Sequence, residues 1–449
     1  MIIGLNRVLE ESLRQSKGTI FYGWYILAAS VVIYFLNVGS TYSAPPVLYP
    51  QLIKEFGSTE AAISLTGAIQ LTIAGLLSPL IGAQIDRYGA RNLMRIGVLL
   101  LGVSMMIYPL ATAVWQLYVL HAVFAVCQPI CGLIIHVVLL STWFAKKRGA
   151  AVGLVVAGSS MAGAVIPNII APIISNPDYG WRYAFWFLAI AFWVIAVPLC
   201  FIVIKNRPSD VGQQPDGDSA VQADGEAPVA EKSTPPGLTF RQARKTSALW
   251  FLAVGSGLIL FAIVIVQSQL VIYLNQDLGF SLELAAFYLS LTWMFSIAGK
   301  FGFAYLSDRF RKQNIMVITT ALLFLGSMLL LRVDVSGGNL SIGLVQSRSA
   351  LIIFCVLFGL GFGGTFSMIQ LLVVECFGAK ELGRILGFIN MVDTLSASAG
   401  IAVGGFLRTS TGSYQIPFII VLISAFAGLI NVWFIKPVPF EEEVNPAVR

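Results

Sequence analysis

The chain has 449 residues, of which 57% are hydrophobic and 11% are charged, and its formal net charge is +6. Soluble domains carry about 25% charged residues, so this composition excludes an ordinary soluble protein and indicates that lipid surrounds much of the chain. The positive charge does not indicate nucleic-acid binding, because the basic residues lie in short segments between long apolar stretches.

Twelve apolar stretches are long enough to cross a bilayer core, which requires about 20 residues of α-helix. They are residues 24–46, 60–82, 93–111, 115–143, 150–173, 182–204, 248–273, 283–305, 314–332, 349–375, 384–406 and 415–435. Residues 1–20 contain Arg7, Arg14 and Lys17 but no long apolar core, so we expect no cleavable signal peptide there. The sequence therefore predicts an all-α membrane protein.

An even number of spans places both termini on one side of the membrane, and the basic residues indicate which side. Most lysines and arginines fall on the side of the termini, and these residues favour cytoplasmic loops. The exceptions are Lys54, Arg182, Arg332, Arg348 and Arg408 on the other side and Lys300 inside a span. We therefore expect both termini in the cytoplasm and the protein in a plasma membrane or a bacterial-type inner membrane.

Residues 205–245 differ from the short connections elsewhere. Pro, Gly, Asp and Ala dominate the segment, so it cannot build a core and we expect a disordered cytoplasmic linker. This linker divides the chain into two six-helix halves, residues 21–204 and 246–436, and residues 437–449 form a cytoplasmic tail. A second polar stretch, residues 333–346, is predicted to be an outer loop.

The two halves repeat similar motifs in the same order, as is typical of transporters built from internal repeats. GAQIDRYGAR (residues 82–91) follows the second span, and FAYLSDRFRK (residues 303–312) follows the eighth. The pattern G-x-x-x-D-R-x-G-x-R resembles the signature of the major facilitator superfamily. The segments FYGWYILA, WFAKKRGAAVGL, GWRYAFWFLA, KNRPSDVGQQPDG and LGFS make the chain similar to the branch of monocarboxylate transporters and oxalate–formate exchangers.

This resemblance implies two pseudo-symmetric halves that move a small solute by alternating access. In the superfamily, the charged residues of the signature latch the cytoplasmic side; a solvated loop that follows the charge rule is the alternative. The second copy has Arg311 where the signature has its second glycine, so we expect a weaker latch there. The residues assigned to gating are Gly82, Asp86, Arg87, Gly89, Arg91, Asp308 and Arg309.

Lys300 is a charged residue inside the eighth span. It precedes Asp308 by eight residues, which places it roughly 12 Å from the end of the helix. A charge at this depth is costly and indicates a function, although a long lysine can also snorkel towards the interface. In the resembling branch, an arginine at this spacing binds the substrate carboxylate. Lysine keeps the charge but not the bidentate fork, so the mode of anion recognition stays open.

Asp393 is the second charge inside a span, at mid-depth of the eleventh. Removal from water favours the protonated form of a carboxyl group, which suits a proton-coupling site. Alternatively, Lys300 and Asp393 pair with each other as a structural bridge. The resemblance does not decide, because monocarboxylate transporters have an aspartate where Ser296 stands, and oxalate–formate exchangers have a basic residue in the region of Asp393.

Other polar residues lie in spans that line the central cavity of the resembling fold. They are Asn37, Tyr42, His121, Gln128, Gln267, Gln269 and Gln370. Hydrogen bonding between helices is as good an explanation for each as substrate contact, and we expect His121 to be solvated near the outer end. We assign Asn37, Tyr42, Gln267 and Ser296 to substrate binding together with Lys300.

These features predict a secondary transporter of a small organic anion, a monocarboxylate, with proton coupling. Exchange of one organic anion for another is the alternative within transport, and a solute receptor that moves nothing is the alternative outside it. No catalytic constellation or cofactor motif is found, and the spacing of Cys127, Cys131 and His136 fits no zinc pattern. We therefore expect no enzyme activity, cofactor, metal site or nucleic-acid partner.

Overall fold

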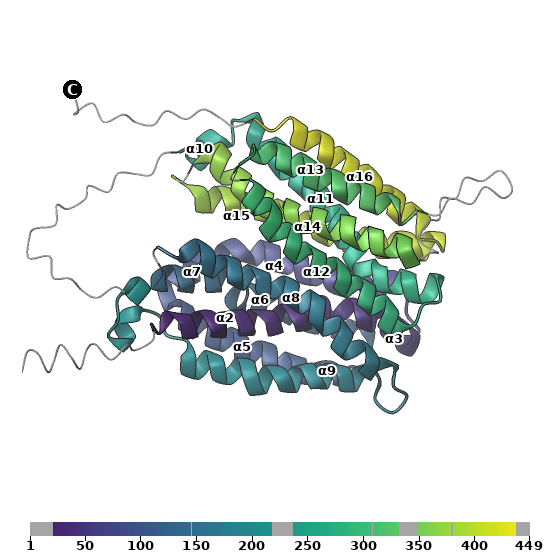
Figure 1. Cartoon of the computed structure of the whole chain (residues 1–449). Helices are drawn as coiled ribbons and strands as arrows, with labels where there is room; N and C mark the ends of the chain where they lie inside the picture. Colours follow the sequence, from purple (N-terminus) through teal and green to yellow (C-terminus); the bar gives the residue numbers. More distant parts are fainter. Residues whose placement is uncertain are drawn as a thin grey trace, which may run out of the picture.

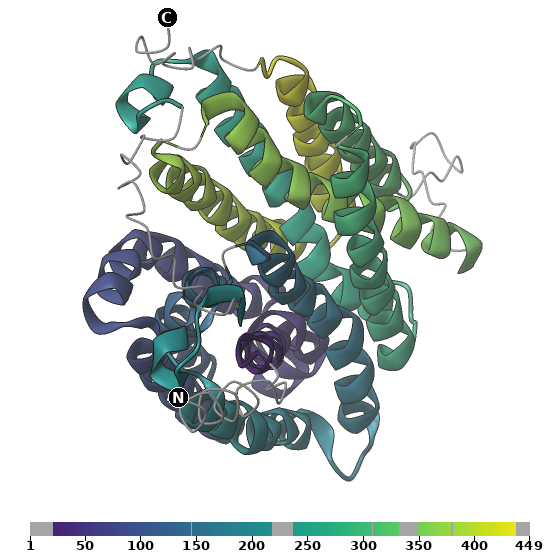
Figure 2. The same ribbon diagram turned by 60° about the vertical axis from the view of Figure 1, so that its left-hand side comes forward.

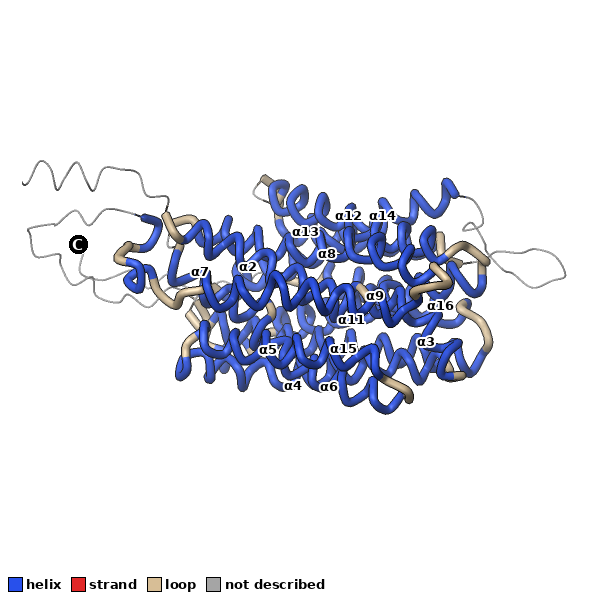
Figure 3. Tube along the Cα trace, turned by 90° about the horizontal axis from the view of Figure 1, so that it is seen from below, coloured by secondary structure: helices blue, strands red, loops and turns tan. Residues whose placement is uncertain are grey.

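The described part of the chain is helical throughout. The computed structural model describes residues 21–217, 237–331 and 348–436, apart from residues 145, 308 and 379, and these residues form no β-strand. The helices run along one axis, and the loops gather at the two ends (Figure 3). This arrangement confirms the prediction of an all-α membrane protein.

Each predicted span coincides with a helix or a run of helices. In the first half these are α2 (Gly23–Val38) with η1 (Gly39–Ser43) and α3 (Pro45–Phe56), α4 (Glu60–Tyr88), α5 (Ala90–Ile107) with η2 (Tyr108–Leu110), α6 (Val114–Cys131) with α7 (Leu133–Trp143), α8 (Arg148–Ser175), and α9 (Gly180–Ala191) with η3 (Phe192–Ala196) and η4 (Leu199–Val203). In the second half they are α11 (Ser247–Ile272) with η7 (Tyr273–Asp277), α12 (Leu282–Leu306), α13 (Lys312–Met328), α14 (Arg348–Phe377), α15 (Leu382–Thr411) and α16 (Gln415–Trp433).

Most of these helices have the length and composition of membrane spans. Among the described residues, eleven stretches are long and apolar enough to cross a membrane. The helix α13 has 17 residues and occupies the place of the ninth predicted span.

The helices of the two halves form two layers (Figure 1). Between the layers, α4 packs against α15 and α8 packs against α12. The start of α2 and the end of α16 lie at the same end of the bundle (Figure 1), which we call the terminal end; the opposite end is the far end. Figure 2 turns the terminal end forward and shows the first half below the second.

Hydroxyl side chains begin several of these helices. The Oγ1 atoms of Thr59 and Thr246 and the Oγ atom of Ser281 each accept a hydrogen bond from the backbone N–H three residues further on. These bonds satisfy amide groups that a helix start leaves unpaired. The loops between spans can therefore stay short.

The predicted linker folds at both ends. Residues 205–217 and 237–245 contain η5 (Pro208–Val211), η6 (Pro215–Gly217) and α10 (Phe240–Ala243). Asn206 Oδ1 accepts the backbone N–H of Arg91 at 2.9 Å, and Asp216 Oδ2 accepts that of Lys146 at 2.7 Å. At the other end, the backbone N–H of Leu238 donates to the carbonyl oxygen of Phe377 at 2.8 Å, and that of Phe240 donates to Glu381 Oε2 at 2.9 Å. The expectation of disorder was therefore wrong for these ends, because hydrogen bonds fix the first to loops of the first half and the second to the second half.

The middle of the linker, residues 218–236, lies outside the described residues. So do residues 1–20 and 437–449 and the predicted outer loop at 333–346. The boundaries that we assigned to these segments stay predictions.

Candidate functional site

A polar stripe runs along α12 on the face that packs between the two halves. Thr292, Ser296 and Lys300 are spaced by four residues and so lie one above the other on one side of the helix. All three are buried, and Lys300 is only 7% exposed. Since α12 packs against α8 of the other half, this stripe lies at the interface between the halves.

The ammonium group of Lys300 points across that interface. Its Nζ atom lies 2.6 Å from Ser160 Oγ on α8, and it lies 4.9 Å from the centre of the Phe366 ring on α14. Ser296 Oγ lies 3.2 Å from the same Ser160 oxygen. Lys300 forms no ion pair with any described carboxylate. The hydroxyl of Ser160 is thus the neutral partner of a buried cation.

The depth of Ser160 argues against the snorkelling alternative. Ser160 follows the first residue of α8, Arg148, by twelve residues, so it lies roughly 18 Å along the helix from the terminal end. The Lys300 nitrogen that bonds to it therefore lies deep along the helix and not near the terminal end, where a snorkelling lysine would place it.

The site lies where α8 and α12 begin to separate. On the far side of Ser160, a methyl group on Gly163 would overlap the ring of Trp293 on α12. Towards the terminal end, the same face of α8 continues through Gly153 and Gly149, where an added Cβ would meet nothing within 4 Å. The two layers diverge in the same direction (Figure 1). The ammonium group therefore lies between a tight contact of α8 with α12 on the far side and a less crowded stretch of α8 towards the terminal end.

Gln267 on α11 joins the stripe at its far side. Its Nε2 donates to Thr292 Oγ1 at 3.2 Å, and its Oε1 is buried without a hydrogen-bond partner among the described residues. The structure thus brings together Lys300, Ser296 and Gln267 from the predicted substrate-binding residues.

Asp393 lies on α15 and bonds within its own half. Ser256 Oγ on α11 donates to Asp393 Oδ1 at 2.5 Å, and the carboxyl group is buried. No described lysine or arginine forms an ion pair with Asp393. The alternative in which Lys300 and Asp393 pair is therefore not realised in this conformation.

Asn37 and Tyr42 are not part of the stripe on α12. Asn37 Nδ2 donates to the carbonyl oxygen of Cys131 at 2.8 Å, where α6 stops before Gly132. Tyr42 is half-buried and packs with Ala68 and neighbouring apolar residues. The hydrogen bond from Asn37 satisfies a backbone carbonyl at a helix break, which gives Asn37 a structural role.

His121 is not solvated as expected. It is only 1% exposed, its Nδ1 lies 2.8 Å from Gln70 Oε1, and its Nε2 lies 3.2 Å from the hydroxyl of Tyr108. Gln70 and Gln128 both donate to Thr41 of η1. The expectation was wrong because a polar network across four helices satisfies the ring, which sequence position alone does not reveal.

Sequence reasoning missed the partners of the charged groups. Ser160 lies in the run VVAGSSMAGAV, where serine is an ordinary small residue of a membrane helix, and Ser256 lies in a similar run. Phe366 and Thr292 also gave no signal. A serine in an apolar span is too common to single out without knowing which helix it faces.

Comparison with known proteins identifies the family. A family model described as Major Facilitator Superfamily matches residues 30–345 and 335–449. The chain belongs to this superfamily. It is therefore a multi-pass membrane transport protein and not an enzyme, as predicted.

Its relatives within the superfamily are distant in sequence. The fujikurins efflux protein of Gibberella fujikuroi is 24% identical over 356 residues, which cover 79% of this chain and 68% of that protein. Monocarboxylate transporter 4 of Gallus gallus is 22% identical over 438 residues, which cover 95% of this chain and 86% of that protein. The predicted likeness to the monocarboxylate branch is confirmed; the likeness to oxalate–formate exchangers stays a prediction.

A solved structure shares the fold. It is a crystal structure of a bacterial homologue of the human lysosomal transporter Spinster, in an inward-facing and unoccupied conformation. The TM-score is 0.67 at 15% sequence identity, and the match covers 93% of this chain and 95% of that chain.

The superfamily signature lies where α4 ends and α5 begins. Gly82, Asp86 and Arg87 belong to α4, but the side chains of Asp86 and Arg87 lie outside the described part of the structure, as does the whole of Asp308. Gly89 has φ of 78°, which favours glycine, and Asn206 packs beside it. Arg91 bonds to Asn206 through its backbone, and Arg309 donates to the hydroxyl of Tyr305 at 2.7 Å. The gating assignment stays a prediction.

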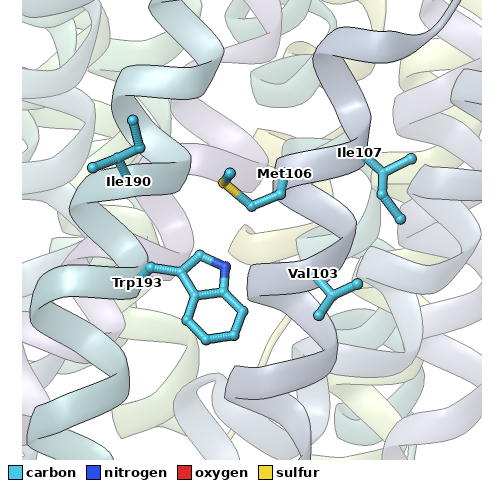
Figure 4. Close-up of a pocket in the computed structure, with 5 residues that line it drawn as sticks. All are labelled: Val103, Met106, Ile107, Ile190 and Trp193. Atoms are coloured by element: carbon cyan, nitrogen blue, oxygen red, sulfur yellow. The ribbon is translucent and has the colours of Figure 1, made fainter.

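A pocket of about 420 Å³ lies away from these charges, between α5 and the end of α9 with η3 (Figure 4). It is lined by Val103, Met106, Ile107, Ile190 and Trp193. Four of these side chains are well exposed on the outside of the bundle, so lipid tails are the natural neighbours of this superfamily member there. An apolar lining of this kind does not suit an anion.

Proposed function

We propose that this superfamily member transports a small monocarboxylate anion by alternating access, with the carboxylate bound at Lys300. The observation that carries the proposal is a buried ammonium group that faces a neutral serine of the other half rather than an acid. A charge buried with so few partners is costly, and an incoming carboxylate would neutralise it. Because the ammonium group bonds to a residue of α8, a bound anion would contact both halves at their interface.

The relatives support the class of solute. One curated relative that matches nearly the whole chain is named a monocarboxylate transporter. A single buried lysine provides one positive charge, which matches a monovalent anion better than a dianion. The face of α8 beside Lys300 is less crowded towards the terminal end, at Gly153 and Gly149. We take this end as the cytoplasmic side because basic loop residues gather there.

We further propose that Asp393 carries the coupling proton. Its carboxyl group is buried, faces a serine hydroxyl, and forms no ion pair with a described cation. Such a group can bind and release a proton without breaking a salt bridge. Its hydrogen bond to Ser256 ties its protonation to the contact between α11 and α15.

The test is uptake of labelled butyrate into proteoliposomes that contain the purified protein, with and without a pH gradient. Lys300→Ala should reduce uptake at least about thirtyfold, as expected when one partner of a buried charge contact is lost. Lys300→Arg should keep part of the activity because it keeps the charge. Lys54→Ala, at an exposed lysine, is the control and should transport normally.

The same vesicles distinguish the alternatives. Uptake that requires an anion inside the vesicles and ignores the pH gradient would indicate exchange. Saturable binding of butyrate without uptake would indicate a receptor. Full uptake by a correctly folded Lys300→Ala protein, judged by gel filtration, would refute the role of Lys300.

A further inference from the structure

The amide group of Gln267 has a fixed orientation. The hydroxyl of Thr292 carries one proton, and it donates this proton to the carbonyl oxygen of Leu289 at 2.7 Å. Thr292 Oγ1 can therefore only accept from Gln267, so the group that lies 3.2 Å away must be the amide nitrogen, Nε2. The amide oxygen, Oε1, consequently points elsewhere.

That oxygen is an acceptor without a donor. Gln267 is only 8% exposed, and Oε1 has no hydrogen-bond partner among the described residues. Buried polar atoms in proteins are almost always paired, so an unpaired acceptor beside the proposed carboxylate site is a candidate partner for a group on the ligand. A group that satisfies Oε1 must be a donor, such as a hydroxyl group.

The stripe on α12 sets the distance between this acceptor and the cation. Lys300 Nζ and Ser296 Oγ both contact Ser160 Oγ, at 2.6 and 3.2 Å, so the ammonium group lies level with Ser296. Thr292, which accepts the hydrogen bond from the amide of Gln267, precedes Ser296 by four residues. This spacing is one helical turn, or roughly 6 Å along the helix axis. A ligand that reaches both groups must therefore carry its donor well away from its carboxylate.

We propose that Gln267 Oε1 accepts a hydrogen bond from a hydroxyl group on the carbon chain of the substrate, at position 3 or 4 from the carboxylate carbon. This inference rests on the proposed binding of the carboxylate at Lys300. The preferred substrates are then short 3- or 4-hydroxycarboxylates. A hydroxyl on position 2 lies too close to the carboxylate to reach Gln267.

The experiment measures competition against labelled butyrate uptake in proteoliposomes. The competitors are matched pairs: propionate with 3-hydroxypropionate, and butyrate with 4-hydroxybutyrate; 2-hydroxypropionate is the positional control. With the natural protein, at least one acid with a distal hydroxyl should inhibit butyrate uptake at a concentration about tenfold lower than its unsubstituted partner. This is the effect expected of one hydrogen bond to a group that is otherwise left unpaired. The 2-hydroxy acid should compete no better than propionate.

The variant Gln267→Met keeps the length and flexibility of the side chain but removes the acceptor. In this variant each hydroxylated acid should compete no better than its unsubstituted partner, and this ratio does not depend on the overall rate of uptake; Gln267→Leu is the second variant should the first fold poorly. An advantage that survives in the variant, or its absence from the natural protein, would overturn the inference. Failure of the proposed function would look different, because uptake of unsubstituted butyrate would then be absent or indifferent to Lys300→Ala.

Discussion

Both intramembrane charges bond to serine hydroxyls in this conformation. Lys300 bonds to Ser160 across the interface, and Asp393 bonds to Ser256 inside the second half. A hydroxyl is a weaker partner for a charge than an opposite charge. In the proposed mechanism, Lys300 would exchange this partner for an anion, and Asp393 would take up a proton.

At the level of single residues, Asp393→Asn should separate transport from the pH gradient. The asparagine cannot take up a proton, but its Oδ1 can still accept the hydroxyl of Ser256, so the fold should be kept. We expect uptake of labelled butyrate in Asp393→Asn vesicles to be the same with and without an imposed gradient.

The control for this prediction is Asp178→Asn, at an exposed acid of the far end. It should respond to the gradient as the natural protein does. A gradient response that persists in Asp393→Asn would show that the coupling proton binds elsewhere.

At the level of helices, glycines set the position of the stripe on α12. A methyl group on Gly363 of α14 would overlap the carbonyl oxygen of Ser296, and one on Gly359 would lie 2.5 Å from that of Thr292. The backbones of α12 and α14 are therefore in direct contact beside the stripe. This contact fixes the rotation of α12, and hence the direction in which Lys300 points.

We expect Gly363→Ala to destabilise the protein by about 1–3 kcal/mol, because two backbones would have to move apart. The measurement is thermal unfolding of the purified protein in detergent. Gly302→Ala is the matched control on α12, since an added Cβ there meets nothing within 4 Å. Equal melting temperatures for the two variants would show that the contact is not tight.

At the level of the whole molecule, hydrogen bonds join the halves towards the far end. Thr72 Oγ1 lies 2.6 Å from Ser398 Oγ, Ser398 also donates to the carbonyl of Ala68 at 2.8 Å, and Gln269 donates to Ser64 at 2.9 Å. These bonds connect α4 with α15 and α11. The proposed alternating access would require these hydrogen bonds to break when the far end opens.

A cross-link at this place should stop transport. The double variant Thr72→Cys with Ser398→Cys brings two thiols close enough for a disulfide. Uptake should fall to background after mild oxidation and return after reduction, because the locked protein cannot open its far end.

Each single cysteine variant should keep its uptake under the same oxidation. If the double variant transports normally while a gel assay shows the cross-link, the far end does not open between α4 and α15. The rocking motion would then have to use another contact.

The charged residues of the site could be predicted, but their partners could not. Lys300 and Asp393 stand out because a charge in an apolar span is costly wherever the helix lies. Ser160 and Ser256 do not, since a hydroxyl in such a span can bond to its own backbone. The same limit explains the wrong expectation for His121, whose partners Gln70 and Tyr108 lie on other helices.

By itself, the sequence determined the membrane helices, their repeated motifs and the two buried charges. These depend on hydrophobic length and on the cost of charge in lipid, which are properties of each segment alone. Only the tertiary structure decided that Lys300 faces Ser160 rather than Asp393, that Gln267 joins the stripe, and that Asn37 does not. The reason is that the partners of a side chain depend on how the helices rotate and cross. For α12, the contacts with the glycine-rich face of α14 set this rotation. No single segment of the sequence contains that information.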